Sequence, residues 1–143
     1  MILRNLTLKQ FQKQAQALAR KYQGQPLSIG LIGPLGAGKT TFVKTFAKTL
    51  GGRRITSPTF VINHEHKIAQ GKLFHLDFYR VSHNKHLPLL GLDEILNGQN
   101  TVLIEWVDKF PALVQACDLL IKIQINQDFT RNVSIERQNF RKN

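Results

Sequence analysis

The chain has 143 residues, which is enough for one domain to bury a core without disulfides or structural metals. Twenty lysines and arginines against nine aspartates and glutamates give a formal net charge of +11, which indicates an anionic partner such as nucleic acid or an acidic protein surface, although a solvated basic surface explains it equally well. The single cysteine, Cys117, excludes an intramolecular disulfide, and no apolar run is long enough for a signal peptide or a membrane span, so we expect a cytoplasmic protein with no membrane partner.

The first predicted element is an amphipathic helix over residues 8–19, where apolar residues recur at spacings of three and four. Thr7 and Gln10 match a capping box at its start. Gly and Pro in residues 24–26 end the helix, and the apolar run 27–32 has the length of a buried strand.

A second helix is predicted over residues 40–50, with the glycines at 51–52 supplying a left-handed cap. Residues 59–68 and 72–81 both alternate between apolar and polar side chains, and the gap between them contains glycine. This pattern predicts an antiparallel hairpin with its turn at residues 69–71.

The rest of the chain is predicted to be mainly β-structure. A short helix is expected at residues 92–96, and the apolar run 101–107 predicts another strand. A final hairpin joins residues 119–125 to 132–136 around a turn at 127–130. One strand–loop–helix unit with antiparallel hairpins predicts an α/β layered fold of the P-loop NTPase type with a mixed sheet, and we expect residues 1–143 to form a single domain.

The loop between the first predicted strand and the second helix carries the strongest chemical signal. Residues 33–40 match the P-loop pattern G-x-x-x-x-G-K-S/T, whose glycines allow backbone N–H groups to turn toward phosphate oxygens. Lys39 is then expected to reach the β- and γ-phosphates, and the Thr40 hydroxyl to bind Mg²⁺. The residues of this segment predicted to bind ATP are Gly33, Gly36, Ala37, Gly38, Lys39, Thr40 and Thr41.

A P-loop needs an acidic partner at the end of a neighbouring strand. Asp77 and Glu105 both follow apolar runs and are the two candidates. The alternative for Asp77 is a salt bridge with Arg80, and the alternative for Glu105 is an exposed strand end. Spacing alone does not divide the catalytic roles between them.

Histidine and tryptophan residues leave further alternatives open. His64 and His66 share a predicted strand face, which permits a metal site, but no cysteine joins them, so hydrogen-bonded or exposed histidines are the simpler interpretation. Trp106 could stack on a base or serve as a half-buried core residue. For Cys117 we expect a small buried apolar side chain rather than a reactive thiol.

Five ordered segments together resemble the bacterial TsaE (YjeE) family of small cytoplasmic ATPases, over nearly the whole chain. The segments are residues 33–41, 57–60, 75–80, 90–94 and 104–106. The resemblance implies a Mg²⁺-dependent ATPase that is required to form threonylcarbamoyl-adenosine at position 37 of tRNAs reading codons that begin with A. It also implies action in a complex with the TsaD and TsaB proteins, through which tRNA is met indirectly.

Carried over by position, the resemblance implies that Glu105 is the magnesium-side carboxylate beside Thr40, and that Asp77 orients the attacking water. It places a switch-like segment at Ser57, Pro58 and Thr59. It further implies nucleotide contacts from Thr7, Trp106, Asp108 and Arg131. The segment Val107-Asp108-Lys109 departs from the family's usual sequence there, which weakens the assignment of Asp108.

Two other functions compete with an accessory ATPase. A small-molecule P-loop kinase would use the same phosphate cradle, but hairpins occupy the region where an arginine-rich lid is expected. A nucleotide-independent basic RNA-binding module would leave Lys39 and Thr40 unexplained.

Overall fold

A single mixed sheet organises the computed structural model, which describes residues 1–53, 55, 63–82 and 90–138. Seven strands within these residues follow the order β1-β7-β6-β2-β5-β4-β3. Their bounds are β1 (Ile2–Leu6), β2 (Leu27–Ile32), β3 (Asn63–Ile68), β4 (Gly71–Asp77), β5 (Thr101–Glu105), β6 (Leu119–Ile125) and β7 (Arg131–Arg137). Strands β4, β5, β2 and β6 are parallel, whereas β3, β7 and β1 pair antiparallel with their neighbours. The predicted α/β fold with a mixed sheet and antiparallel hairpins is therefore confirmed.

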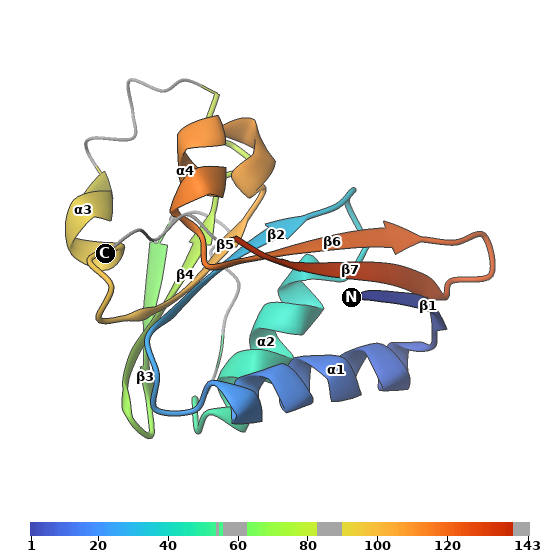
Figure 1. Cartoon of the computed structure of the whole chain (residues 1–143), viewed down its shortest axis with the longest axis horizontal. Coiled ribbons are helices and arrows are strands. Elements are labelled where there is room, and N and C mark those ends of the chain that lie inside the picture. Colours follow the sequence, from blue (N-terminus) through green and yellow to red (C-terminus); the bar gives the residue numbers. More distant parts are fainter. Residues whose placement is uncertain (54, 56–62, 83–89, 139–143) are drawn as a thin grey trace.

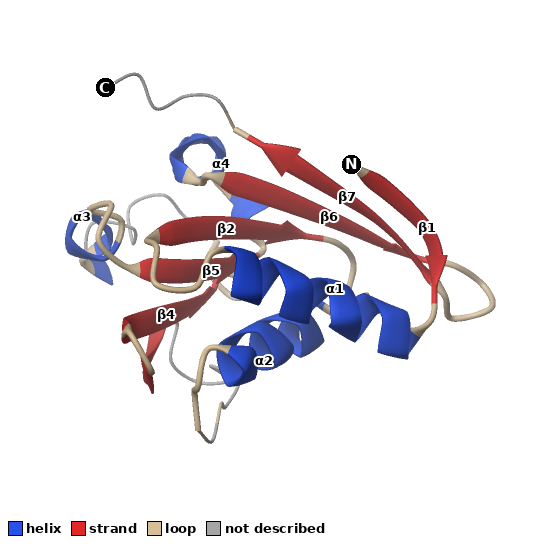
Figure 2. Cartoon of the chain, turned by 60° about the horizontal axis from the view of Figure 1, so that its bottom comes forward, coloured by secondary structure: helices blue, strands red, loops and turns tan. Residues whose placement is uncertain are grey.

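Helices cover both faces of the sheet. The long helices α1 (Leu8–Lys21) and α2 (Lys39–Thr49) lie side by side over one face (Figure 2). The short elements α3 (Leu92–Ile95), η2 (Val107–Lys109) and α4 (Pro111–Ala116) lie over the other face (Figure 1). Two buried apolar clusters fill the corresponding layers. No helix among the described residues is long and apolar enough to cross a membrane.

Local sequence explains how α1 and α2 begin and end. The Thr7 hydroxyl accepts the Gln10 backbone N–H, and the Gln10 side chain accepts the Thr7 N–H, so the predicted capping box is confirmed. Gly51 after α2 has φ of +92°, the left-handed cap expected there. The rings of Phe11 and Phe42 lie 6.0 Å apart and join the two helices in the buried layer.

Several predicted strand boundaries differ from the observed ones. The described part of the first hairpin strand begins at Asn63, because residues 56–62 lie outside the described residues. Strand β4 ends at Asp77 rather than at residue 81. Strand β5 ends at Glu105 rather than at residue 107, because the next residue, Trp106, adopts a left-handed conformation with φ of +61°. Strand β1 and helix α4 were not predicted at all.

Candidate active site

The site lies where three parallel strands end together. Strand β2 leads into the P-loop, while β4 and β5 end at Asp77 and Glu105. The strand register pairs Asp77 with Glu105 and Glu105 with Leu31, so both carboxylates sit beside the start of the phosphate-binding loop. Ligand sites of open α/β sheets lie at this carboxyl edge.

Glycine geometry shapes the loop itself. Gly36 and Gly38 have φ of +77° and +114°, a backbone region that other residues adopt only with strain. Gly33 has a different reason to be glycine, because a Cβ there would lie 2.6 Å from the backbone oxygen of Ile123. Gly38 precedes α2 without a side-chain cap, so the first-turn N–H groups of this 11-residue helix are available to an anion.

Lys39 is buried and turned back onto the loop. Its Nζ donates to the carbonyl oxygens of Gly33, at 2.5 Å, and Pro34, at 2.9 Å, and lies 4.0 Å from the centre of the Trp106 ring. Burial lowers the Lys39 pKa, and the nearby carboxylates of Glu105 and Asp77 partly oppose this shift. Two neutral backbone carbonyls thus hold the ammonium group beside the P-loop.

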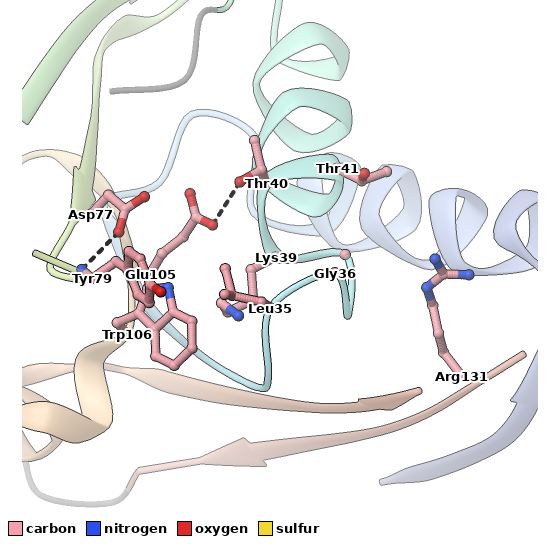
Figure 3. A pocket seen from close by; sticks show the side chains of 11 residues that line it. Leu35, Gly36, Lys39, Thr40, Thr41, Asp77, Tyr79, Glu105, Trp106 and Arg131 are labelled. Atoms are coloured by element: carbon pink, nitrogen blue, oxygen red, sulfur yellow. Dashed lines mark hydrogen bonds between the residues drawn. The ribbon is translucent and has the colours of Figure 1, made fainter. Parts of the chain in front are cut away.

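Glu105 connects α2 to β4 through its two carboxylate oxygens. Its Oε1 accepts the Thr40 hydroxyl at 2.8 Å, and its Oε2 lies 2.5 Å from His75 Nε2 (Figure 3 shows the Thr40 contact). Glu105 is 2% exposed and His75 is fully buried, so the alternative of Glu105 as an exposed strand end is wrong. The sequence patterns did not single out His75, and its position two residues before Asp77, on the same strand face, was the missed signal.

Asp77 lies at the mouth of the site and is half-buried. Its Oδ1 accepts the Tyr79 backbone N–H at 2.9 Å. Burial raises the Asp77 pKa, the Tyr79 N–H lowers it, and Glu105 raises it further. The ion pairs found among the described residues do not include the alternative Asp77–Arg80 salt bridge.

Two aromatic side chains that follow the strands form one wall of the site. The rings of Tyr79 and Trp106 are 5.0 Å apart, and the Lys109 ammonium lies 5.4 Å from the centre of the Tyr79 ring and donates to the Tyr79 carbonyl. Trp106 is partly buried and packs against the apolar cluster on the α4 side of the sheet, as the alternative of a half-buried core residue expected, and its ring also lies beside the Lys39 ammonium (Figure 3). Tyr79 and Leu35 also line the pocket, although the sequence patterns did not single them out.

The predicted site residues divide into two groups. Pocket-lining residues among them are Gly36, Gly38, Lys39, Thr40, Thr41, Asp77, Glu105, Trp106 and Arg131. Arg131, from the start of β7, donates from Nε to the Ala37 carbonyl at 2.9 Å and so ties the last hairpin to the P-loop.

The other predicted contacts do not line this pocket. Thr7 caps α1, Asp108 is exposed on η2, and Gly33 and Ala37 form the base of the loop. The switch-like residues Ser57, Pro58 and Thr59 lie outside the described residues.

Cys117 is buried on the opposite face of the sheet, beneath α4. Its Sγ donates to the Leu113 carbonyl at 3.3 Å, and burial raises the thiol pKa to about 12. The expectation of a small buried apolar side chain is confirmed.

Comparisons with known proteins agree over most of the chain. Residues 6–133 match the family model described as threonylcarbamoyl adenosine biosynthesis protein TsaE. The chain is 31% identical over 127 residues to a Haemophilus influenzae protein and 36% identical over 129 residues to an Aquifex aeolicus protein. Both relatives carry the name tRNA threonylcarbamoyladenosine biosynthesis protein TsaE, and the matches cover 88% of this chain, 80% of the first relative and 88% of the second.

A solved structure shares the fold. The crystal structure of Bacillus subtilis YdiB superposes with a TM-score of 0.73 at 30% sequence identity. The superposition covers 99% of this chain and 87% of the other.

Proposed function

The chain belongs to the TsaE family of tRNA threonylcarbamoyladenosine biosynthesis proteins, and from this premise we propose that it is a single-domain, cytoplasmic, Mg²⁺-dependent ATPase. Its hydrolysis of ATP would support formation of threonylcarbamoyl-adenosine at position 37 of tRNAs that read codons beginning with A. Its proposed partners are the TsaD and TsaB proteins, with tRNA as the substrate of that complex.

One observation carries the ATPase proposal. Lys39, Thr40, Asp77 and Glu105 come from three different elements and line one pocket at the start of α2 (Figure 3). A buried carboxylate paired with a threonine hydroxyl supplies the hard oxygen donors that Mg²⁺ prefers, so Thr40 and Glu105 fit a magnesium site. Bound Mg²⁺ would neutralise charge on the phosphate oxygens.

The positions of the protein groups support the following proposed roles. The N–H groups of the loop and of the first turn of α2 bind the phosphates, and Lys39 exchanges the carbonyls of Gly33 and Pro34 for β- and γ-phosphate oxygens. Asp77 is half-buried and lines the pocket, and no described residue hydrogen-bonds its second carboxylate oxygen, so it can accept a hydrogen bond from the attacking water and orient it. Trp106 and Tyr79 shield the reacting phosphate from bulk solvent.

Phosphate release from ATP without any acceptor tests this proposal. We expect steady hydrolysis that requires Mg²⁺, stops with a chelator and increases when TsaB and TsaD are added. Hydrolysis that appears only with a small-molecule hydroxyl acceptor would instead identify a kinase.

A further inference from the structure

Acidic residues are confined to the later part of this chain. All nine aspartates and glutamates follow position 64, whereas ten of the 20 lysines and arginines lie within residues 1–64. Helices α1 and α2 both belong to this first segment. Every charged side chain on these two helices is therefore positive.

Apart from the buried Lys39 of the P-loop, the cations of both helices face away from the core. On α1, Lys9, Lys13 and Arg20 are exposed and lie roughly half a turn around the helix from the buried Phe11. On α2, Lys44 and Lys48 are exposed opposite the buried apolar side. Because α1 and α2 lie side by side over the same face of the sheet (Figure 2), these cations share one surface. This basic face consists of Lys9, Lys13, Arg20, Lys21, Lys44 and Lys48.

Among the described residues, no carboxylate forms an ion pair with this surface. The ion pairs found among the described residues are Lys72–Glu65, His75–Glu105 and Lys122–Glu136, and none includes a residue of the basic face. Like charges held on two adjacent helices repel one another, and a polyanion bound across them relieves that repulsion. A bound polyanion also releases its own condensed counterions.

The side chains of the basic face favour a phosphate backbone over a protein surface. Five of its six cations are lysines, and lysine is depleted in the centres of protein interfaces, which are enriched in aromatic residues, methionine and arginine. Among the described residues of α1 and α2, Leu8 is the one exposed large apolar side chain, so this surface lacks the apolar centre of a typical protein interface. We propose that the basic face of α1 and α2 binds the phosphate backbone of RNA.

The identity of the RNA rests on the proposed function, which makes tRNA the relevant polymer. Phosphate contacts of this kind position an RNA without reading its sequence. The basic face is separate from the pocket, since none of its six residues lines it. RNA binding and ATP hydrolysis can therefore be measured independently on the same protein.

The test compares two triple variants with the same net charge. The first variant, Lys9→Gln, Lys13→Gln and Arg20→Gln, changes the basic face and keeps good helix formers. The matched control neutralises three exposed cations on strands: Lys67→Gln, Lys72→Gln and Arg137→Gln. Fluorescence anisotropy of a labelled tRNA transcript, titrated with the full chain over a salt series, gives the affinity and its salt slope, and thermal unfolding confirms that both variants fold.

The basic-face variant should bind the transcript about tenfold more weakly. The slope of log affinity against log salt concentration should fall by about two to three, because each lost phosphate contact lowers that slope by about one. The control should bind like the original chain, and both should hydrolyse ATP at its rate. Equal losses in the two variants would mean that only net charge matters, and the proposal would be wrong. It would also be wrong if the basic-face variant kept its tRNA affinity and instead lost binding to TsaD or TsaB. Absence of ATP hydrolysis in the original chain would refute the proposed function and leave the RNA result standing.

Discussion

At the scale of single residues, Lys39 is the proposed phosphate-binding cation, because its buried ammonium has neutral acceptors that phosphate oxygens can replace. Lys39→Ala should reduce ATP hydrolysis at least about a hundredfold, as expected when a charge-stabilising donor is lost. Lys44→Ala on the exposed side of α2 is the control and should hydrolyse ATP normally. Phosphate release measures both, with circular dichroism to show that the fold is retained. Near-normal turnover by Lys39→Ala would place the active site elsewhere.

Replacing Glu105 or Asp77 by its amide should impair two different steps, nucleotide binding in the first case and hydrolysis in the second. Glu105→Gln removes the charge beside Thr40 and should weaken Mg²⁺-dependent nucleotide binding. Asp77→Asn should leave binding nearly unchanged and slow hydrolysis, because it removes an acceptor for water. Equilibrium titration with a fluorescent ATP analogue, beside single-turnover hydrolysis, separates binding from chemistry. Equal losses of binding would show that the two residues share one role.

His75 contacts the Oε2 atom of Glu105 from β4, and within the described residues its buried Nδ1 has no hydrogen-bond partner. Outer-shell partners of this kind orient a ligand, and their loss typically costs about ten- to a hundredfold in metal affinity or activity. His75→Leu should therefore raise the Mg²⁺ concentration needed for half-maximal hydrolysis by about tenfold. His75→Gln keeps an amide N–H donor and should recover part of the loss. An unchanged Mg²⁺ requirement in a folded His75→Leu variant would contradict this account.

At the scale of elements, sequence patterns identified those with strong periodicity or clear end signals. Helix α1 combines apolar periodicity with a capping box, and helix α2 combines it with a glycine cap. Strand β6 is an apolar run bounded by a turn. Strand β1, with the sequence ILRNL, has too few residues to establish alternation, and its pairing with β7 joins the two ends of the chain. Helix α4 is a six-residue element begun by Pro111, which is shorter than the window that a helical period needs.

Thr7 caps helix α1, whereas its proposed contact with the nucleotide is untested. Thr7→Ala removes the capping box of α1 and should lower the free energy of unfolding by about 1 kcal/mol. Thr7→Ser keeps the hydroxyl and should retain most of the stability. Denaturant unfolding of both variants measures this effect, and their KM for ATP shows whether Thr7 also contacts the nucleotide. A Thr7→Ala variant with the same free energy of unfolding as the original chain would contradict the capping role.

At the scale of the whole molecule, sequence patterns identified the chemical groups of the site better than its internal contacts. The P-loop is continuous in sequence, so its residues could be named directly, and the apolar runs before Asp77 and Glu105 singled out these two carboxylates, although the predicted strands continued to residues 81 and 107. The contact between His75 and Glu105 depends on the pairing of β4 with β5, which local periodicity does not specify. The same limit applies to Arg131, whose contact with Ala37 spans 94 positions and was not predicted; the family resemblance implied only that Arg131 lies near the nucleotide.

The central claim is that this chain supports tRNA modification through ATP hydrolysis at its P-loop. Reconstitution with TsaB, TsaD, ATP, a threonylcarbamoyl donor and an unmodified tRNA reading an ANN codon tests it most directly, with threonylcarbamoyl-adenosine measured by mass spectrometry of digested tRNA. We predict repeated rounds of modification with the original chain, and little or none when it is omitted or replaced by the folded Lys39→Ala variant. Full modification without the chain, or with Lys39→Ala in its place, would contradict the claim.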